Sequence, residues 1–252
     1  MLMKMRQFFL CGGLLVAALL ASPSARAQMS TDLIMETYNS NISVITNGAI
    51  NKSVMENTMK GNNAGGTARR GTAATRSGAS VSSAYTPTPA LRQQTVQGYV
   101  NRLKTSNPPA SQAIAENFGP GKYDYSKIYR DLTKGAGLRE NDATDVLTSY
   151  MILGWMIVNN VTDDNAITTP MAQGLRAQIA PLMAANTQAR SRAAQVGEEM
   201  KLQTVVVHSG WQSAIKEGKL VAYQQGIKNL FKNQYGMDLS QYKLTNNGLA
   251  SK

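Results

Sequence analysis

The sequence predicts an all-α protein, a bundle of about five to seven helices around one buried central helix, preceded by a disordered low-complexity linker. Three observations support this prediction. Apolar residues recur at helical spacing from about residue 90 onward, residues 142–159 are apolar on every side of a helix, and residues 57–89 contain almost nothing large enough to bury. The chain has 252 residues and a formal net charge of +11, a length suited to one medium-sized domain with additional segments.

Residues 1–27 are typical of a signal peptide. Lys4 and Arg6 precede an apolar stretch from Phe8 to Ala21, and the small-residue site Ala25-Arg26-Ala27 follows. The apolar stretch is shorter than the roughly 20 residues that a membrane-spanning helix needs. We therefore expect cleavage before Gln28, no transmembrane anchor afterwards, and an exported protein, periplasmic or secreted, of a bacterium.

Two segments separate the signal from the helical domain, which we place at residues 90–252. Residues 28–56 show partial helical spacing and predict a short helical or loosely ordered segment. Residues 57–89 are rich in Gly, Ala, Ser, Thr and Asn. Such a segment cannot bury enough apolar surface to offset the entropy lost on ordering, so we predict a flexible basic linker.

The linker supplies the candidate polyanion-binding residues, Arg69, Arg70 and Arg76. No acidic residue occurs between Glu56 and Glu116, so this part of the chain would attract an anionic envelope polymer, or an acidic face of a partner protein that the sequence does not identify. Nucleic acid is not an expected partner, because the linker offers no aromatic side chain for base stacking before Tyr85. The competing interpretation is a solubilising linker with incidental charge.

The first half of the domain predicts three helices. Val96, Tyr99, Val100 and Leu103 share one face of the first helix, which Asn107-Pro108-Pro109 ends. A shorter helix is expected at residues 111–118. The third helix is expected at residues 125–133, because Gly135 and Gly137 follow it and favour the end of a helix.

The most apolar element is Asp142–Asn159, which we predict to be the buried central helix. Thr169 with Pro170 forms an N-cap and first-turn pair for the next helix, which Pro181 should bend. We expect Thr187 to cap a further helix. Its residues 204–207 favour β-structure and leave open whether it is interrupted.

The C-terminal part predicts one more helix and a tail. Leu220, Tyr223, Ile227 and Leu230 form one apolar face, and Gly236 provides the stop. The tail, residues 239–249, is expected to be extended and packed back on the bundle.

Four sequence patterns resemble an uncharacterised family of secreted bacterial proteins, known as a domain of unknown function. They are residues 137–145 (GLRENDATD), the helix of Trp155, Arg176-Ala177-Gln178, and residues 244–249 (LTNNGL). The resemblance covers roughly residues 85–249. It implies an α-helical exported domain behind a variable low-complexity region, and it brings no catalytic residues with it.

The composition excludes several classes of chemistry. Cys11 lies in the signal peptide and His208 is the single histidine, so thiol catalysis, Cys-ligated zinc and sites with several His ligands are excluded for the mature chain. No glycine pattern of a nucleotide-binding loop follows a predicted strand. We expect no cofactor and no metal.

The candidate catalytic residues are carboxylates, Glu116, Glu140, Asp142 and Asp145. Asp142 and Asp145 lie three residues apart at a helix N-terminus, where carboxylates cap the helix; cation binding and acid/base catalysis are the alternatives. A cell-wall hydrolase would need two carboxyls about 5–10 Å apart. Whether the protein is an enzyme stays open, with a non-enzyme favoured.

The leading hypothesis for function is an exported, non-enzymatic interaction protein of the bacterial envelope. It follows from the absence of a recognised catalytic motif in the sequence and from the basic linker. A carboxylate-dependent cell-wall hydrolase is the first alternative, and a secreted effector or toxin is the second.

Overall fold

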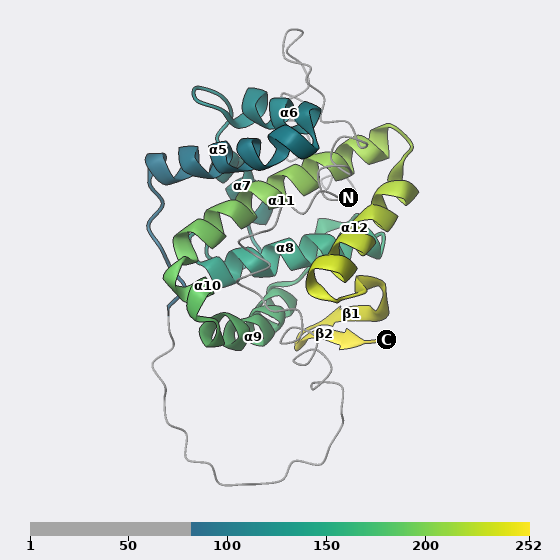
Figure 1. The fold of residues 1–252 in the computed structure, drawn as a ribbon. Coiled ribbons are helices and arrows are strands. Elements are labelled where there is room, and N and C mark those ends of the chain that lie inside the picture. Colours follow the sequence, from purple (N-terminus) through teal and green to yellow (C-terminus); the bar gives the residue numbers. More distant parts are fainter. Residues whose placement is uncertain (1–81) are drawn as a thin grey trace, which may run out of the picture.

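The computed structural model describes residues 82–252. The predictions for the signal peptide, for residues 28–56 and for most of the linker, with Arg69, Arg70 and Arg76, therefore lie outside the described residues. The described part is all-α with one short β-hairpin (Figure 1), which confirms the predicted fold class. Its elements are α5 (Pro89–Ser106), α6 (Pro108–Phe118), α7 (Tyr125–Thr133), α8 (Ala143–Val158), η1 (Asp164–Ala166), α9 (Thr169–Ala185), α10 (Thr187–Ser191), α11 (Ala193–Lys216), α12 (Leu220–Tyr235), η2 (Leu239–Gln241), β1 (Tyr242–Thr245) and β2 (Gly248–Ser251).

Helices α5 and α6 follow each other with a single residue between them. Thr88 caps α5 by accepting a hydrogen bond from the Leu91 amide, and Asn107 does the same for α6 through the Ala110 amide. Pro108 occupies the first turn of α6, where a missing amide hydrogen costs nothing. Pro108 and Pro109 therefore follow the end of α5 closely and begin α6. Helix α6 thus begins three residues earlier than the predicted start at residue 111.

Helix α8 is the buried centre of the fold. Asp142 caps it by accepting hydrogen bonds from the Thr144 and Asp145 amides, and nearly all of its residues are buried. Helix α11 crosses diagonally between the α5–α6 pair and α8 (Figure 1) and packs against α5, α7 and α8. The predicted central helix is confirmed, and α11 emerges as the second internal helix.

The caps of α9 and α10 and the separation of α10 from α11 differ from expectation, and the open question about residues 204–207 is answered. Thr168, one residue before the expected Thr169, caps α9, and Asn186 rather than Thr187 caps α10. Helix α11 continues without a break through residues 204–207. Val205, Val206 and Val207 are buried there, so burial of their side chains in the core outweighs their β-propensity. The separate, five-residue α10 brings the described helices to eight, one above the expected range.

The C-terminal tail forms the hairpin of β1 and β2, which packs on α9, while η2 before it packs on α8. The Trp155 indole donates to the Tyr242 carbonyl over 2.9 Å. The Gln178 side chain accepts from the Leu249 amide and donates to the Leu249 carbonyl. Helix α9 can lie this close because Gly174 contacts the hairpin turn, where a Cβ atom would clash with the backbone of Asn246. The tail is thus extended and packed back on the bundle.

Residues 83–85, which we call the strap, precede α5 and lie along the start of α8. The Ser83 carbonyl accepts from the Ala143 amide over 2.9 Å, and the Tyr85 amide donates to the Asn141 carbonyl over 2.9 Å. The chain is therefore fixed well before the expected end of the flexible linker at residue 89. Composition concealed this boundary, because one aromatic side chain and a few backbone hydrogen bonds order the strap.

Candidate functional site

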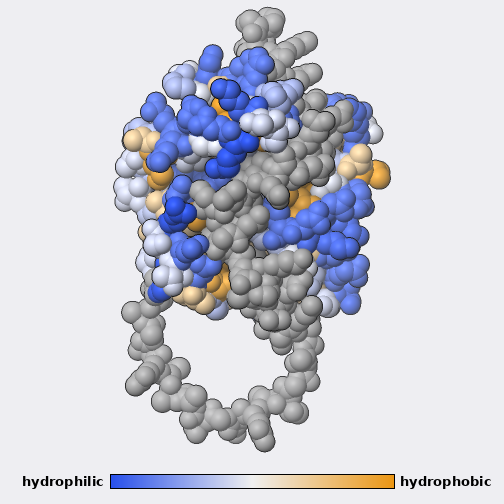
Figure 2. Space-filling view, viewed as in Figure 1, coloured by the Kyte–Doolittle hydropathy of each residue, from blue (hydrophilic) through white to orange (hydrophobic). Residues whose placement is uncertain are grey.

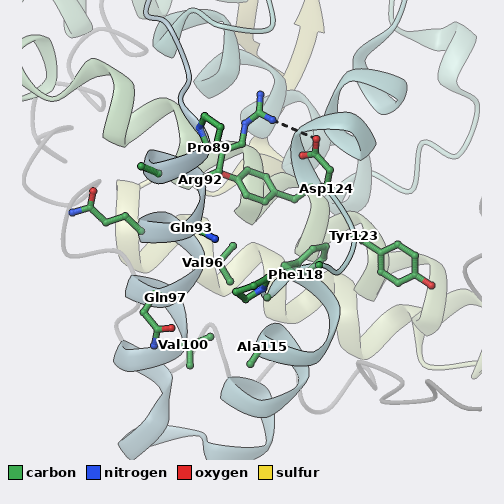
Figure 3. Close-up of a pocket in the computed structure, with 16 residues that line it drawn as sticks. Pro89, Arg92, Gln93, Val96, Gln97, Val100, Ala115, Phe118, Tyr123 and Asp124 are labelled. Atoms are coloured by element: carbon green, nitrogen blue, oxygen red, sulfur yellow. Dashed lines mark hydrogen bonds and ion pairs between the residues drawn. The ribbon is translucent and has the colours of Figure 1, made fainter.

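A groove of about 650 Å³ lies between the first three turns of α5, the end of α6 and the loop 119–125 (Figure 3). Its floor is apolar and is made by Val96, Val100, Ala115 and Phe118. Glutamine side chains of α5 lie beside this floor, whereas Tyr123 points away from it (Figure 3). The volume falls within the range of about 300–1,000 Å³ that is usual for ligand-binding sites.

An ion pair stands at one end of the groove. Arg92 Nη1 lies 3.3 Å from Asp124 Oδ2 (Figure 3). Asp124 is also the N-cap of α7, where Oδ1 accepts from the Ser126 and Lys127 amides. Arg92 Nε faces inward and lies 3.8 Å from Oε2 of Glu198. Arg92 therefore connects a carboxylate at the groove with a carboxylate in the core.

Glu198 of α11 is the centre of a buried polar network directly behind the groove. Its side chain is 0% exposed. Oε2 accepts from the Tyr125 hydroxyl over 2.7 Å, and Oε1 accepts from the Tyr85 hydroxyl over 2.9 Å. Burial, followed by the charge of Glu198, raises the pKa of both phenols above the usual range, so both stay protonated and donate.

Lys201 neutralises Glu198 from the next turn of α11. Its ammonium group is also fully buried and donates to Glu198 Oε1 and to Asn141 Oδ1, each over 2.7 Å. The rings of Tyr85 and Tyr129 lie 5.3 and 5.8 Å from Nζ. The additional hydrogen bonds offset part of the desolvation cost of this buried charge pair.

A second buried carboxylate, Glu199, follows in the sequence and pairs with Arg102 of α5. Burial raises the pKa of Glu199, an effect that the positive charge of Arg102 only partly opposes. The Arg102 guanidinium also lies 5.3 Å from the ring centre of Tyr99. Helix α11 is thus joined to α5 by a salt bridge and to α7 through Tyr125.

Asp142 and Asp145, two of the predicted candidates, lie at the N-terminus of α8, where Asp142 is the N-cap and Asp145 is in the first turn. Both side chains are 1% exposed. Arg139 Nη2 lies 2.7 Å from Asp142 Oδ2, and Arg139 Nε lies 2.8 Å from Asp145 Oδ2. Arg176 of α9 contacts the other oxygen of Asp145. The pair holds the loop before α8 and the helix α9 against the core.

The other two predicted candidates lie apart. Glu140 pairs with Arg130 over 2.8 Å, and this hydrogen bond is the main cause of its lowered pKa. Glu116 accepts from Gln112 on the exposed side of α6. None of the four predicted carboxylates lines the groove, and Asp124 is the carboxylate that does.

Arg92, Glu198 and Lys201 were not predicted as site residues. A signal for the two residues of α11 was present, because Glu198 and Lys201 lie among apolar residues of a predicted helix. Charged residues on the buried side of a helix are rare unless they are paired. Which residues pair with them depends on tertiary packing and could not be read from spacing.

Within residues 82–252, no group of three or more His, Cys, Asp or Glu residues is arranged to hold a metal ion. In the same range no helix has both the length and the apolarity needed to cross a bilayer. Comparisons with protein-family models, curated proteins and solved structures find no match to this chain. The resemblance to a secreted family therefore stays a prediction.

Proposed function

We propose that the protein is an exported, non-enzymatic interaction protein of the bacterial envelope, and that its groove binds an extended, largely uncharged segment of a partner protein. The observation that carries the proposal is the lining of the groove. An apolar floor suits apolar side chains, and the amides of Gln93 and Gln97 can both donate to and accept from a peptide backbone. The charged groups at its end already satisfy each other.

The size of the groove agrees with a short peptide. It follows α5 from Pro89 to Val100, which at about 1.5 Å per helical residue is roughly 17 Å. An extended peptide rises about 3.3 Å per residue. The groove therefore accommodates about five residues of an extended chain.

The carboxylates offer the hydrolase alternative little support. Asp142 and Asp145 are buried against arginines, and Glu116 lies outside the groove. A general acid or base must reach the bond that it cleaves; Asp142 and Asp145 are enclosed, and Glu116 is exposed but lies away from the groove. Soluble fragments released from sacculi by the mature protein, with the release abolished by Glu140→Gln or Glu116→Gln, would reverse this conclusion.

The test of the groove uses an immobilised library of random heptapeptides and the mature chain, residues 28–252. Ala115→Arg places a long side chain on the floor of the groove and should abolish binding of the selected peptides. Gln112→Arg adds the same charge one turn earlier on α6, at an exposed position outside the groove, and should leave binding unchanged. Equal binding by wild type and Ala115→Arg would contradict the proposal.

The basic linker is proposed as a second, separate contact, with an anionic envelope polymer as its partner. This proposal is supported by the absence of acidic residues between Glu56 and Glu116 and by the presence of Arg69, Arg70 and Arg76. A variant lacking residues 57–81 should lose low-salt retention on envelope material. Retention that is unchanged by this deletion would remove the linker from the proposal, and retention that survives high salt would point to the folded domain.

A further inference from the structure

The two oxygens of Glu198 face different parts of the molecule. Oε1 accepts from Tyr85 of the strap and from Lys201. Oε2 accepts from Tyr125 and lies near Arg92, and both of these residues line the groove. A carboxylate is rigid and planar, so any rotation that follows the loss of a partner on Oε1 also moves Oε2.

The strap is held at Ser83 and at Tyr85. The Ser83 carbonyl accepts from the first amide of α8, the Tyr85 amide donates to the Asn141 carbonyl, and Ser83 Oγ donates to Asp142 over 2.6 Å. The Tyr85 ring lies directly over Gly197, where an added Cβ atom would clash with ring carbons. The glycine thus creates the space that lets the phenol reach Glu198.

We propose that Tyr85 is a positioning residue for the groove: its hydroxyl fixes the Glu198 carboxylate, which in turn holds Tyr125 and Arg92 at the end of the groove. The strap and the groove are therefore coupled through one carboxylate. The importance of this coupling for binding rests on the function proposed above. The coupling itself exists without a ligand and can be measured without one.

The experiment is amide hydrogen exchange on the mature chain. The reporters are Lys122 and Tyr123 in the groove loop, whose amides donate to the Gly119 and Asn117 carbonyls. Tyr85→Phe keeps the ring over Gly197 and removes the hydroxyl. Exchange at both reporters should rise roughly tenfold or more, as expected when one hydrogen bond to a charged group is lost.

The matched control is Tyr223→Phe. Tyr223 is fully buried in α12 and its hydroxyl donates to the Val207 carbonyl over 2.7 Å, so the variant also loses one buried hydrogen bond but outside the network. It should leave the ratio of reporter exchange to core exchange unchanged. The proposal is overturned if Tyr85→Phe leaves Lys122 and Tyr123 unaffected, or if Tyr223→Phe accelerates them equally.

A second variant tests whether Glu198 carries the effect. If Tyr85 and Tyr125 act through the same carboxylate, the changes in reporter exchange caused by Tyr85→Phe and Tyr125→Phe should not add in the double variant. Additive changes would contradict the inference.

With the library-selected heptapeptide as the probe, Tyr85→Phe should weaken binding at least fivefold. Unchanged affinity would refute the positioning role and leave the proposed function standing, whereas a wild type that binds no peptide would refute the proposed function alone.

Discussion

Replacement of Lys201 by methionine tests the buried network most directly. Lys201 and Glu198 are both fully buried, and their ion pair spans 2.7 Å. Methionine fills much of the same space without a charge, so Glu198 would lose its close buried partner and keep only Arg92, whose Nε lies 3.8 Å from Oε2. Loss of one partner from a buried pair costs about 3–5 kcal/mol. In a domain of this size, about 2–4 °C per kcal/mol converts this cost to a fall in Tm of roughly 6–20 °C.

The assay is urea denaturation followed by the fluorescence of Trp155 and Trp211. The double variant Lys201→Met/Glu198→Gln removes both charges of the pair, and it should recover at least half of the lost free energy because Glu198 no longer carries a buried charge without Lys201. A glutamine also keeps acceptor and donor groups for the two tyrosines. The reasoning is refuted if Lys201→Met costs less than about 1 kcal/mol, or if the double variant is no more stable than the single one.

Three further predictions concern other parts of the fold. The raised pKa of Glu199 means that the folded state binds a proton more tightly than the unfolded state, so this group lowers stability as the pH rises from the unfolded pKa through the folded one. In thermal melts between pH 4 and 7, Glu199→Gln should therefore gain stability relative to wild type as the pH rises; a relative loss would contradict the raised pKa. Gly174→Ala places a Cβ atom against the hairpin turn and should accelerate hydrogen exchange in residues 242–251 by at least tenfold, whereas Gly98→Ala, with an ordinary 3.6 Å contact, should leave it unchanged. Asp145→Ala removes a buried carboxylate that pairs with the partly exposed Arg139 and Arg176 and should cost about 1–3 kcal/mol, and Glu116→Gln, on the surface, should stay within about 0.5 kcal/mol in the same urea titration.

Much of the fold could be predicted from sequence because its signals are local. The apolar periodicity of α5 and α12, the glycine stop at Gly236 and the fully apolar α8 each depend on residues within one element. Helix α11 shows where local signals fail. Its residues 204–207 prefer β-structure by themselves, and burial in the core decides in favour of the helix.

The site was harder to predict because it is made of pairs. Acidic residues near a helix start, such as Asp142, were visible in the sequence as candidates. Some of their arginine partners are local, as Arg139 is for Asp142, and others come from a distant part of the sequence, as Arg176 of α9 does for Asp145. The groove depends on how α5 packs against α6, and one of its ends is formed by the ion pair of Arg92 and Asp124, which lie 32 residues apart in the sequence. The spacing of residues along the sequence does not show which distant residues come into contact in the fold.

The long sequence separations within the network have a consequence for folding rates. The hydrogen bond between Tyr85 and Glu198 joins residues 113 positions apart, and the one between Lys201 and Asn141 joins residues 60 apart. Contacts between distant residues form after the local helices and after most of the chain has collapsed. We expect substitutions in the network to have low φ-values, and to shorten the lifetime of the native state while the folding rate stays nearly constant. The buried ions would then govern how long the folded protein persists rather than how quickly it forms.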